Sequence, residues 1–138
     1  MTVGSAFGPA ASSCPCGSER VYAACCGLLH HGEAAAETAE QLMRSRYSAF
    51  AVGDVAYLVR TWHPRTRPRG LELDASRRWT RLEILRSDRG GPRDTEGVVE
   101  FRAHYADDRA TGIRGGSQHE VSRFVRVGGR WLYLDALR

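Results

Sequence analysis

Four cysteines near the start of the chain are the residues whose spacing predicts a definite chemistry. Cys14, Cys16, Cys25 and Cys26 all fall in the string CPCGSERVYAACC. A disulfide within either close pair would be strained, because one residue separates the first two cysteines and none separates the last two. Four thiolates are the donors that a tetrahedral Zn²⁺ takes. The sequence therefore predicts a structural zinc site, since protein sulfurs would fill every coordination position.

Two histidines after the cysteines leave a second ligand set open. Adjacent residues seldom both reach one ion without a sharply turned backbone, so His30 or His31 could replace Cys26 as the fourth ligand. We favour the four-cysteine set, because thiolates supply both the donor atoms and the charge that compensates the ion. An interpretation without metal, as small buried cysteines or a redox pair, fits this spacing less well.

The length and composition predict one main domain. The chain has 138 residues, of which 42% are hydrophobic, enough for a single packed core. We expect a loose tail over residues 1–13, a zinc knuckle over 14–31 and the main domain over 32–138. The sequence has neither a long apolar run nor a secretory signal, so we expect a soluble cytoplasmic protein without membrane contact.

The basic residues are only a weak indication of RNA binding. The formal net charge is +4, and all 20 basic residues are arginine. Without any lysine, the arginine density partly reflects composition, so we favour a solvated surface over an RNA-binding one. Contacts of arginines with RNA phosphates stay an open alternative. The densest basic region comprises Arg60, Arg65, Arg67, Arg69, Arg77, Arg78 and Arg81.

Helical periodicity begins after the knuckle. Thr38 and Gln41 have the spacing of a capping box, and an apolar stripe with a period near 3.6 residues extends to Ala51. Gly53 suits the end of this helix, and Asp54 suits the N-cap of a second helix that reaches Trp62. A short helical turn is expected near residues 72–78.

The second half of the chain alternates with a period of two, as strands do. Apolar residues alternate over 82–84, 99–105, 119–127 and 131–137, and Gly128-Gly129 predicts a hairpin between the last two segments. Glycines at 90–91 and over 112–116 are expected to break the chain between strands. Helices followed by antiparallel strands indicate an α+β fold.

Two resemblances extend this interpretation. The pattern C-x-C-x8-C-C with Gly-Ser after the second cysteine resembles the SEC-C zinc knuckle of the SecA translocation ATPase, where a histidine takes the place of Cys26. The strings RSRYSAF, GVVEFRAHY and HEVSRFVRVGGRWLYLD resemble the YchJ family of small bacterial proteins. That resemblance implies a nuclear transport factor 2-like (cystatin-like) fold, in which a curved antiparallel sheet wraps around helices and forms a conical pocket. It implies no reaction, and Ala136 departs from the glycine expected there.

In such a fold, function usually lies where the inner sheet face meets the helices. His119, Tyr133 and Asp135 are weak catalytic candidates for acid/base work. The alternative, which we favour, is that these side chains only make structural hydrogen bonds, with Arg46 or Arg123 neutralising Asp135. The side chains considered for the pocket are Tyr47, Trp62, His63, His104, His119, Glu120, Arg123, Tyr133 and Asp135.

Two functions follow as hypotheses. The first is a zinc-binding, non-enzymatic docking or adaptor module for a protein or ribonucleoprotein partner, and the resemblance to SEC-C knuckles implies the translation or secretion machinery. The second is a small-molecule carrier, or an isomerase-, dehydratase- or hydrolase-type enzyme, that uses the cone pocket. Whether the protein is an enzyme stays open, as does a homodimer formed through the outer sheet face.

Overall fold

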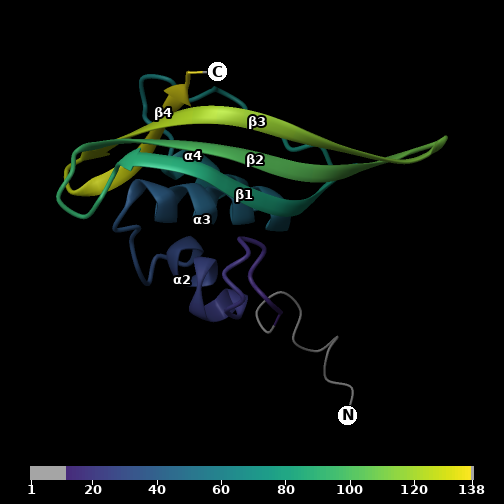
Figure 1. Cartoon of the computed structure of the whole chain (residues 1–138), viewed down its shortest axis with the longest axis horizontal. Helices are drawn as coiled ribbons and strands as arrows, with labels where there is room; N and C mark the ends of the chain where they lie inside the picture. Colours follow the sequence, from purple (N-terminus) through teal and green to yellow (C-terminus); the bar gives the residue numbers. More distant parts are fainter. Residues whose placement is uncertain (1–11, 138) are drawn as a thin grey trace, which may run out of the picture.

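The computed structural model describes residues 12–137 as three layers (Figure 1). A curved sheet covers one side of the long helix α3, and the cysteine-containing segment with α2 lies on the other side. Most of the predicted tail lies outside the described residues, but Ser13 pairs with Val21 in a short antiparallel bridge. The elements are η1 (Tyr22–Ala24), α2 (Cys26–His30), α3 (Ala39–Val52), α4 (Val55–Arg60), β1 (Arg77–Arg89), β2 (Glu96–Arg109), β3 (Gly112–Val127) and β4 (Arg130–Ala136).

The two larger helices begin at the predicted capping residues, and α3 also ends at the predicted one, whereas α4 ends at Arg60, two residues before the predicted Trp62. Thr38 Oγ1 accepts a hydrogen bond from the amide of Gln41 at 3.0 Å. Gly53 closes α3 in the left-handed conformation, with φ of 81°. Asp54 then caps α4 by accepting from the amide of Tyr57 at 3.0 Å. Local side-chain chemistry therefore fixes the corner between the two helices.

Helix α3 is buried on two sides. Leu42 and Tyr47 belong to the main hydrophobic core, which includes Val99 and Phe101 of the sheet. Ser45 and Ser48 are both fully buried, and their hydroxyls contact Tyr57 and Cys14, respectively. Small polar residues on this side let α4 and the cysteine segment approach the helix closely.

The sheet is an antiparallel meander of order β1-β2-β3-β4. Val99, Phe101 and Ala103 of β2 pair with Ser122, Glu120 and Gln118 of β3, and all three β2 residues are buried. The intervening side chains, including His104, lie on the outer face. The predicted alternation is confirmed for this strand.

Two local predictions are wrong. Residues 72–78 form no helical turn, because Asp74 Oδ1 accepts from both the amide and the hydroxyl of Ser76 and the chain then enters β1. The glycines over 112–116 do not break the sheet and lie inside β3. There, Tyr105 packs against Gly116, where a Cβ would lie 2.6 Å from the phenolic oxygen.

The pairing of β3 with β4 contains one irregularity that changes which face β4 side chains occupy. Phe124 pairs with Tyr133, but the preceding residue, Arg123, pairs with Asp135. Leu134 is therefore an extra residue on β4, and it reverses the inward and outward alternation at this point. Tyr133 lies on the inner face, whereas Asp135 lies on the outer face beside Arg123.

The close approach of Gly97 to Gly90 gives a test of this packing. A Cβ at Gly97 would lie 2.5 Å from the Gly90 Cα. We expect Gly97→Ala to lower the free energy of unfolding by about 1–3 kcal/mol, because the backbone must move apart. Gly115→Ala is the matched control, since its nearest neighbour would lie at 3.7 Å. Urea denaturation measures both; equal stability of the two variants would contradict the packing described here.

Candidate metal centre

The four cysteines lie together at one end of the knuckle. Their sulfur atoms all lie within 4.8 Å of one another, and those of Cys16 and Cys25 are 3.7 Å apart. Sulfurs around a tetrahedral zinc ion with bonds of about 2.3 Å would be separated by about 3.8 Å. Three of the cysteines are buried, and Cys25 is partly exposed. The donor set therefore suits one thiophilic metal ion with little rearrangement.

Local backbone geometry brings the four sulfurs to this point. Gly17 turns the chain after Cys16 with φ of 85°, and the Cys14 amide donates to the Arg20 carbonyl at 2.7 Å. Cys25 lies between η1 and α2 with φ of −129° and ψ of −114°. This kink changes the chain direction between Cys25 and Cys26, so both adjacent residues reach the cluster.

The sulfurs also interact electrostatically. Hydrogen bonds from Cys16 and Cys26 lower the pKa of the Cys14 thiol, and a smaller effect of burial opposes them. The hydrogen bond with Cys14 raises the pKa of Cys26, and so does burial. Without a cation, the cluster therefore favours one thiolate that accepts from protonated neighbours. A bound divalent cation would replace those protons, so metal binding should release them.

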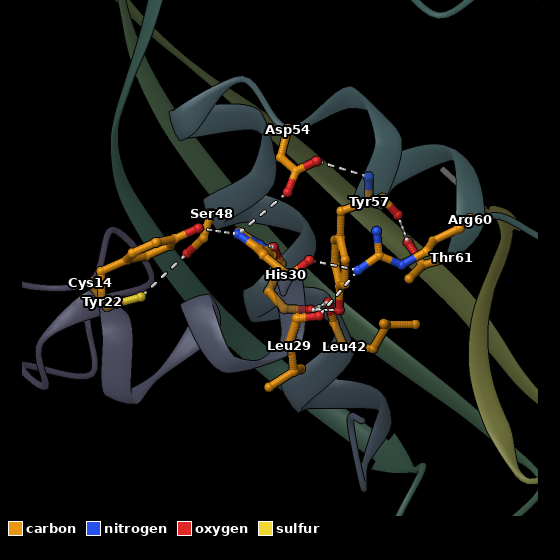
Figure 2. A network of polar contacts seen from close by, with 11 residues as sticks. Cys14, Tyr22, Leu29, His30, Leu42, Ser48, Asp54, Tyr57, Arg60 and Thr61 are labelled. Carbon is orange, nitrogen blue, oxygen red and sulfur yellow. Dashed lines mark hydrogen bonds and ion pairs between the residues drawn. The ribbon is translucent and has the colours of Figure 1, made fainter. Parts of the chain in front are cut away.

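His30 takes part in a different contact network (Figure 2). Its Nε2 donates to the Ser45 carbonyl at 2.8 Å, and its Nδ1 accepts from the Tyr22 hydroxyl. The carbonyl can only accept, so Nε2 carries a hydrogen, and in the neutral ring Nδ1 is then the acceptor. Burial lowers the pKa of His30, which favours this neutral form. Both ring nitrogens are used, and His31 is exposed, so the structure places Cys26 rather than either histidine with the other sulfurs.

Further contacts fasten the knuckle to the helices. Arg44 of α3 donates to the Cys16 carbonyl at 2.8 Å, and the Cys14 sulfur lies 3.6 Å from the Ser48 hydroxyl. Arg60 of α4 donates to the His30 carbonyl at 2.8 Å (Figure 2). The knuckle thus has a fixed position on the domain.

Comparison with known proteins agrees with this two-part architecture. The family model for the YchJ middle NTF2-like domain matches residues 38–136, and the SEC-C motif matches residues 12–28. The chain belongs to the YchJ family. A UPF0225 protein of Streptomyces coelicolor is 57% identical over 122 residues, which cover 88% of this chain and 92% of the relative. A UPF0225 protein of Corynebacterium glutamicum is 48% identical over 120 residues, 87% of this chain and 92% of that protein.

Two solved structures resemble this YchJ-family protein over most of its length. The solution structure of a SEC-C motif containing protein from Rhodopseudomonas palustris has a TM-score of 0.76 and 32% identity, covering 91% of this chain and 97% of that one. The crystal structure of a SEC-C motif containing protein from Psychrobacter arcticus has a TM-score of 0.72 and 28% identity, covering 92% and 82%. The α+β fold with a curved sheet is therefore shared.

The catalytic candidates do not converge in this YchJ-family chain. His119 Nε2 lies 2.7 Å from a Glu100 carboxylate oxygen on the outer sheet face. Asp135 forms a two-point ion pair with Arg123, at 2.7 and 2.8 Å, on the same face. Tyr133 alone of the three lines the inner cavity. The extra residue at Leu134 separates Asp135 from Tyr133, and Arg123 neutralises Asp135 as the structural alternative predicted.

The other pocket candidates divide between the two faces. Tyr47, Trp62 and Glu120 line a cavity of about 250 Å³ between α3 and the inner sheet face. His104 lies outside it, 2.7 Å from Glu83. His63 begins the loop after α4, where its amide donates to the Tyr133 carbonyl at 2.8 Å. Four of the nine candidates therefore line the cavity.

The sequence interpretation gave no cavity role to Arg46. This residue is 4% exposed and lines the cavity from α3. Its position on the helix, three residues after Met43 and one before Tyr47, places it on the buried stripe, which was the available signal. From the sequence, Arg46 is predicted only as a possible partner for Asp135.

The basic region is partly neutralised within the sheet. Arg77 pairs with Asp107 at 2.8 Å, Arg78 with Asp108 at 3.4 Å and Arg81 with Glu83 at 3.6 Å. The exposed arginines Arg65, Arg67 and Arg69 belong to the loop that contacts β4, where Thr66 donates to the Leu134 carbonyl at 2.6 Å. No helix of the described residues is long and apolar enough to cross a membrane.

Replacement of His30 tests its role. We expect His30→Ala to lower the free energy of unfolding by about 2–4 kcal/mol, because the Tyr22 hydroxyl and the Ser45 carbonyl lose a buried partner. Metal content, measured by elemental analysis, should not change. His31→Ala is the matched control and should change stability by less than about 0.5 kcal/mol. A His30→Ala protein that loses its metal would instead make His30 a ligand.

Proposed function

We propose that this protein is a zinc-binding, non-enzymatic docking module. The observation that carries the proposal is the cluster of four cysteine sulfurs within 4.8 Å, on a knuckle bonded to α3 and α4. With four thiolates on the ion, no coordination position is left for a substrate or for water. Such a metal stabilises a surface and performs no chemistry of its own.

The donor chemistry favours zinc over other metals. A tetrahedral set of four thiolates is typical of structural zinc or of iron-sulfur sites, whereas calcium and magnesium prefer oxygen ligands. Within residues 12–37, only a few side chains are buried, and the cysteines form most of that small cluster. A segment of this size without a core of its own depends on metal for its structure.

Removal of the metal should therefore destabilise the protein. We expect one zinc ion per chain and a loss of about 4 kcal/mol on chelation, if free zinc exceeds its dissociation constant a thousandfold. Thermal melting with and without chelator, together with elemental analysis, measures both. Added Zn²⁺ should restore the melting temperature of the chelated wild type but not of Cys14→Ser. Absence of stoichiometric metal and unchanged melting on chelation would contradict the proposal.

The surface offered for docking is the exposed side of the knuckle. Val21 is 46% exposed, and its neighbours Arg20, Ala23 and Ala24 are exposed as well. A groove of about 440 Å³ runs beside them, between Cys25, Leu28 and the start of α3 at Thr38 and Gln41. An apolar residue beside a groove on a fixed segment suits an apolar side chain of a protein partner.

The partner that we propose is a cytoplasmic protein, in the translation or secretion machinery, including the protein part of a ribonucleoprotein. A reducing compartment keeps the thiolates available for metal. The knuckle itself carries only Arg20 among the basic residues of 12–31, so protein contact is favoured over RNA contact there. The exposed arginines of residues 63–70 belong to a loop that is joined to β4 through Thr66 and His63.

A pair of exposed valines tests the surface. Val21→Glu places a charge on the knuckle, while Val127→Glu places the same charge at the end of β3, where Val127 is 51% exposed. Both variants should keep their zinc. Partners cross-linked to the wild type are identified by mass spectrometry. We expect the amount recovered with Val21→Glu to fall about tenfold or more.

Val127→Glu should retain those partners. Equal recovery by the two variants would contradict docking through the knuckle. Loss of all partners on nuclease treatment, with no effect of Val21→Glu, would instead favour RNA as the ligand.

The enzymatic alternative has less support. Its predicted acid/base group is divided between the two sheet faces, and only Tyr133 lies in the cavity. The cavity itself contains two charged side chains, Arg46 and Glu120, which favour binding of a small molecule.

A further inference from the structure

The cavity between α3 and the inner sheet face has mostly apolar walls. Aromatic rings of Tyr47, Phe50, Trp79 and Phe101 line it, and two charged side chains enter it, Arg46 and Glu120. Its volume of about 250 Å³ is below the range of drug-sized pockets, so it suits a small metabolite.

Arg46 is a buried cation without an anionic partner. Its Nη1 donates to the Leu58 carbonyl at 2.9 Å and to the Thr61 hydroxyl at 2.7 Å. Within residues 12–137, no carboxylate lies at ion-pair distance, and the rings of Trp62 and Tyr133 lie at 5.0 and 4.6 Å from the guanidinium carbon. Burial lowers the pKa of Arg46 to about 10, because the charged form loses its contact with water.

A second donor belongs to the same wall. Trp62 lines the cavity, and its indole Nε1 is buried without a hydrogen-bond partner among the described residues. Buried donors are nearly always paired, so an unpaired one beside an unneutralised arginine indicates a missing acceptor. A carboxylate is the acceptor that matches a guanidinium best.

Glu120 supplies the opposite charge. Its Oε2 accepts from the Ser122 hydroxyl at 2.7 Å and from the Tyr133 hydroxyl at 3.1 Å. Tyr133 therefore connects the two charges, since its ring packs on Arg46 and its hydroxyl bonds to Glu120. The cavity holds one cation and one anion that do not pair directly with each other.

A ligand with a single charge would leave one of these groups uncompensated. An organic anion would pair with Arg46 but would be repelled by Glu120, and an amine would meet the reverse problem. A zwitterion satisfies both at once. We propose that the cavity binds a small zwitterion of the α-amino acid type, with its carboxylate toward Arg46, its ammonium toward Glu120 and an apolar side chain among the aromatic rings.

This site is independent of the docking function of the knuckle, because the cavity and the cysteines lie on different sides of α3. Met43, Arg46, Tyr47 and Phe50 line the cavity. Arg44 and Ser48 contact the knuckle. Failure of one proposal would therefore leave the other standing.

Isothermal titration calorimetry of the full, metal-loaded chain tests the ligand class. The probes are L-phenylalanine, L-leucine, 3-phenylpropionate, which lacks the ammonium group, and 2-phenylethylamine, which lacks the carboxylate. We expect at least one of the two amino acids to bind about tenfold or more tightly than either singly charged compound. Equal affinities for all probes, or no binding of either amino acid at millimolar concentration, would overturn the proposal.

The location is tested by one matched pair of variants. Glu120→Gln keeps the shape of the side chain and removes its charge, and Glu100→Gln makes the same change on the outer face of the adjacent strand. Only Glu120→Gln should weaken amino acid binding, by about tenfold. It should not weaken binding of 3-phenylpropionate. An equal effect of the two variants would overturn the assignment.

The side of the cavity around Arg46 is tested by spectroscopy and not by substitution. Arg46 also holds the end of α4, so its replacement would perturb the fold. The chain has three tryptophans. In ¹H–¹⁵N spectra, the indole signals of Trp62 and Trp79, which line the cavity, should shift with ligand. The signal of Trp131, which bonds to the Glu37 carbonyl at 3.2 Å, should not. A shift confined to Trp131 would place the ligand elsewhere.

Discussion

Burial of α3 on two sides is the constraint on which the rest of the molecule depends. One side of the helix packs on the sheet through Leu42 and Tyr47, and the other meets the knuckle and α4 through Ser45 and Ser48. The polar side chains on the two covered sides need partners inside the protein. Ser45 contacts Tyr57, Ser48 contacts Cys14, and Arg46 donates to Leu58 and Thr61.

The sheet separates its charges by face. On the outer side, carboxylates and cations pair across strands, as Glu83 does with His104 and Glu100 does with His119. Such exposed pairs contribute little stability each, but they keep the charges of neighbouring strands compensated. On the inner side, Arg46 and Glu120 are not paired with each other. His104 and His119, the two histidines of the sheet, are paired on the outer face and have no part in the cavity.

The cysteine cluster and the histidine network lie at the two ends of the knuckle. The four cysteine sulfurs meet where the segment has almost no apolar core. His30 then connects it to the domain through Tyr22 and Ser45. The cysteine cluster and the attachment of the knuckle to the domain thus depend on different side chains.

The sequence alone determined those features that depend on a few neighbouring residues. The spacing of the cysteines predicted a metal cluster, Thr38 and Asp54 predicted the helix starts, and the alternation around Phe101 predicted the buried face of β2. Each of these predictions depends on the chemistry of neighbouring residues or on the periodicity of a single strand. The resemblance to YchJ proteins added the curved sheet.

Other features were decided only by tertiary structure. The extra residue at Leu134 moves Asp135 away from Tyr133, because strand register depends on the neighbouring strand and not on β4 itself. The kink at Cys25 lets adjacent cysteines reach one point, and burial between two layers leaves Arg46 without a carboxylate at ion-pair distance within residues 12–137. The sequence offered His30 only as an alternative metal ligand, yet its partners are Tyr22 and Ser45, which is fifteen residues later in the chain. Such outcomes depend on which segments meet in space, which one sequence does not specify.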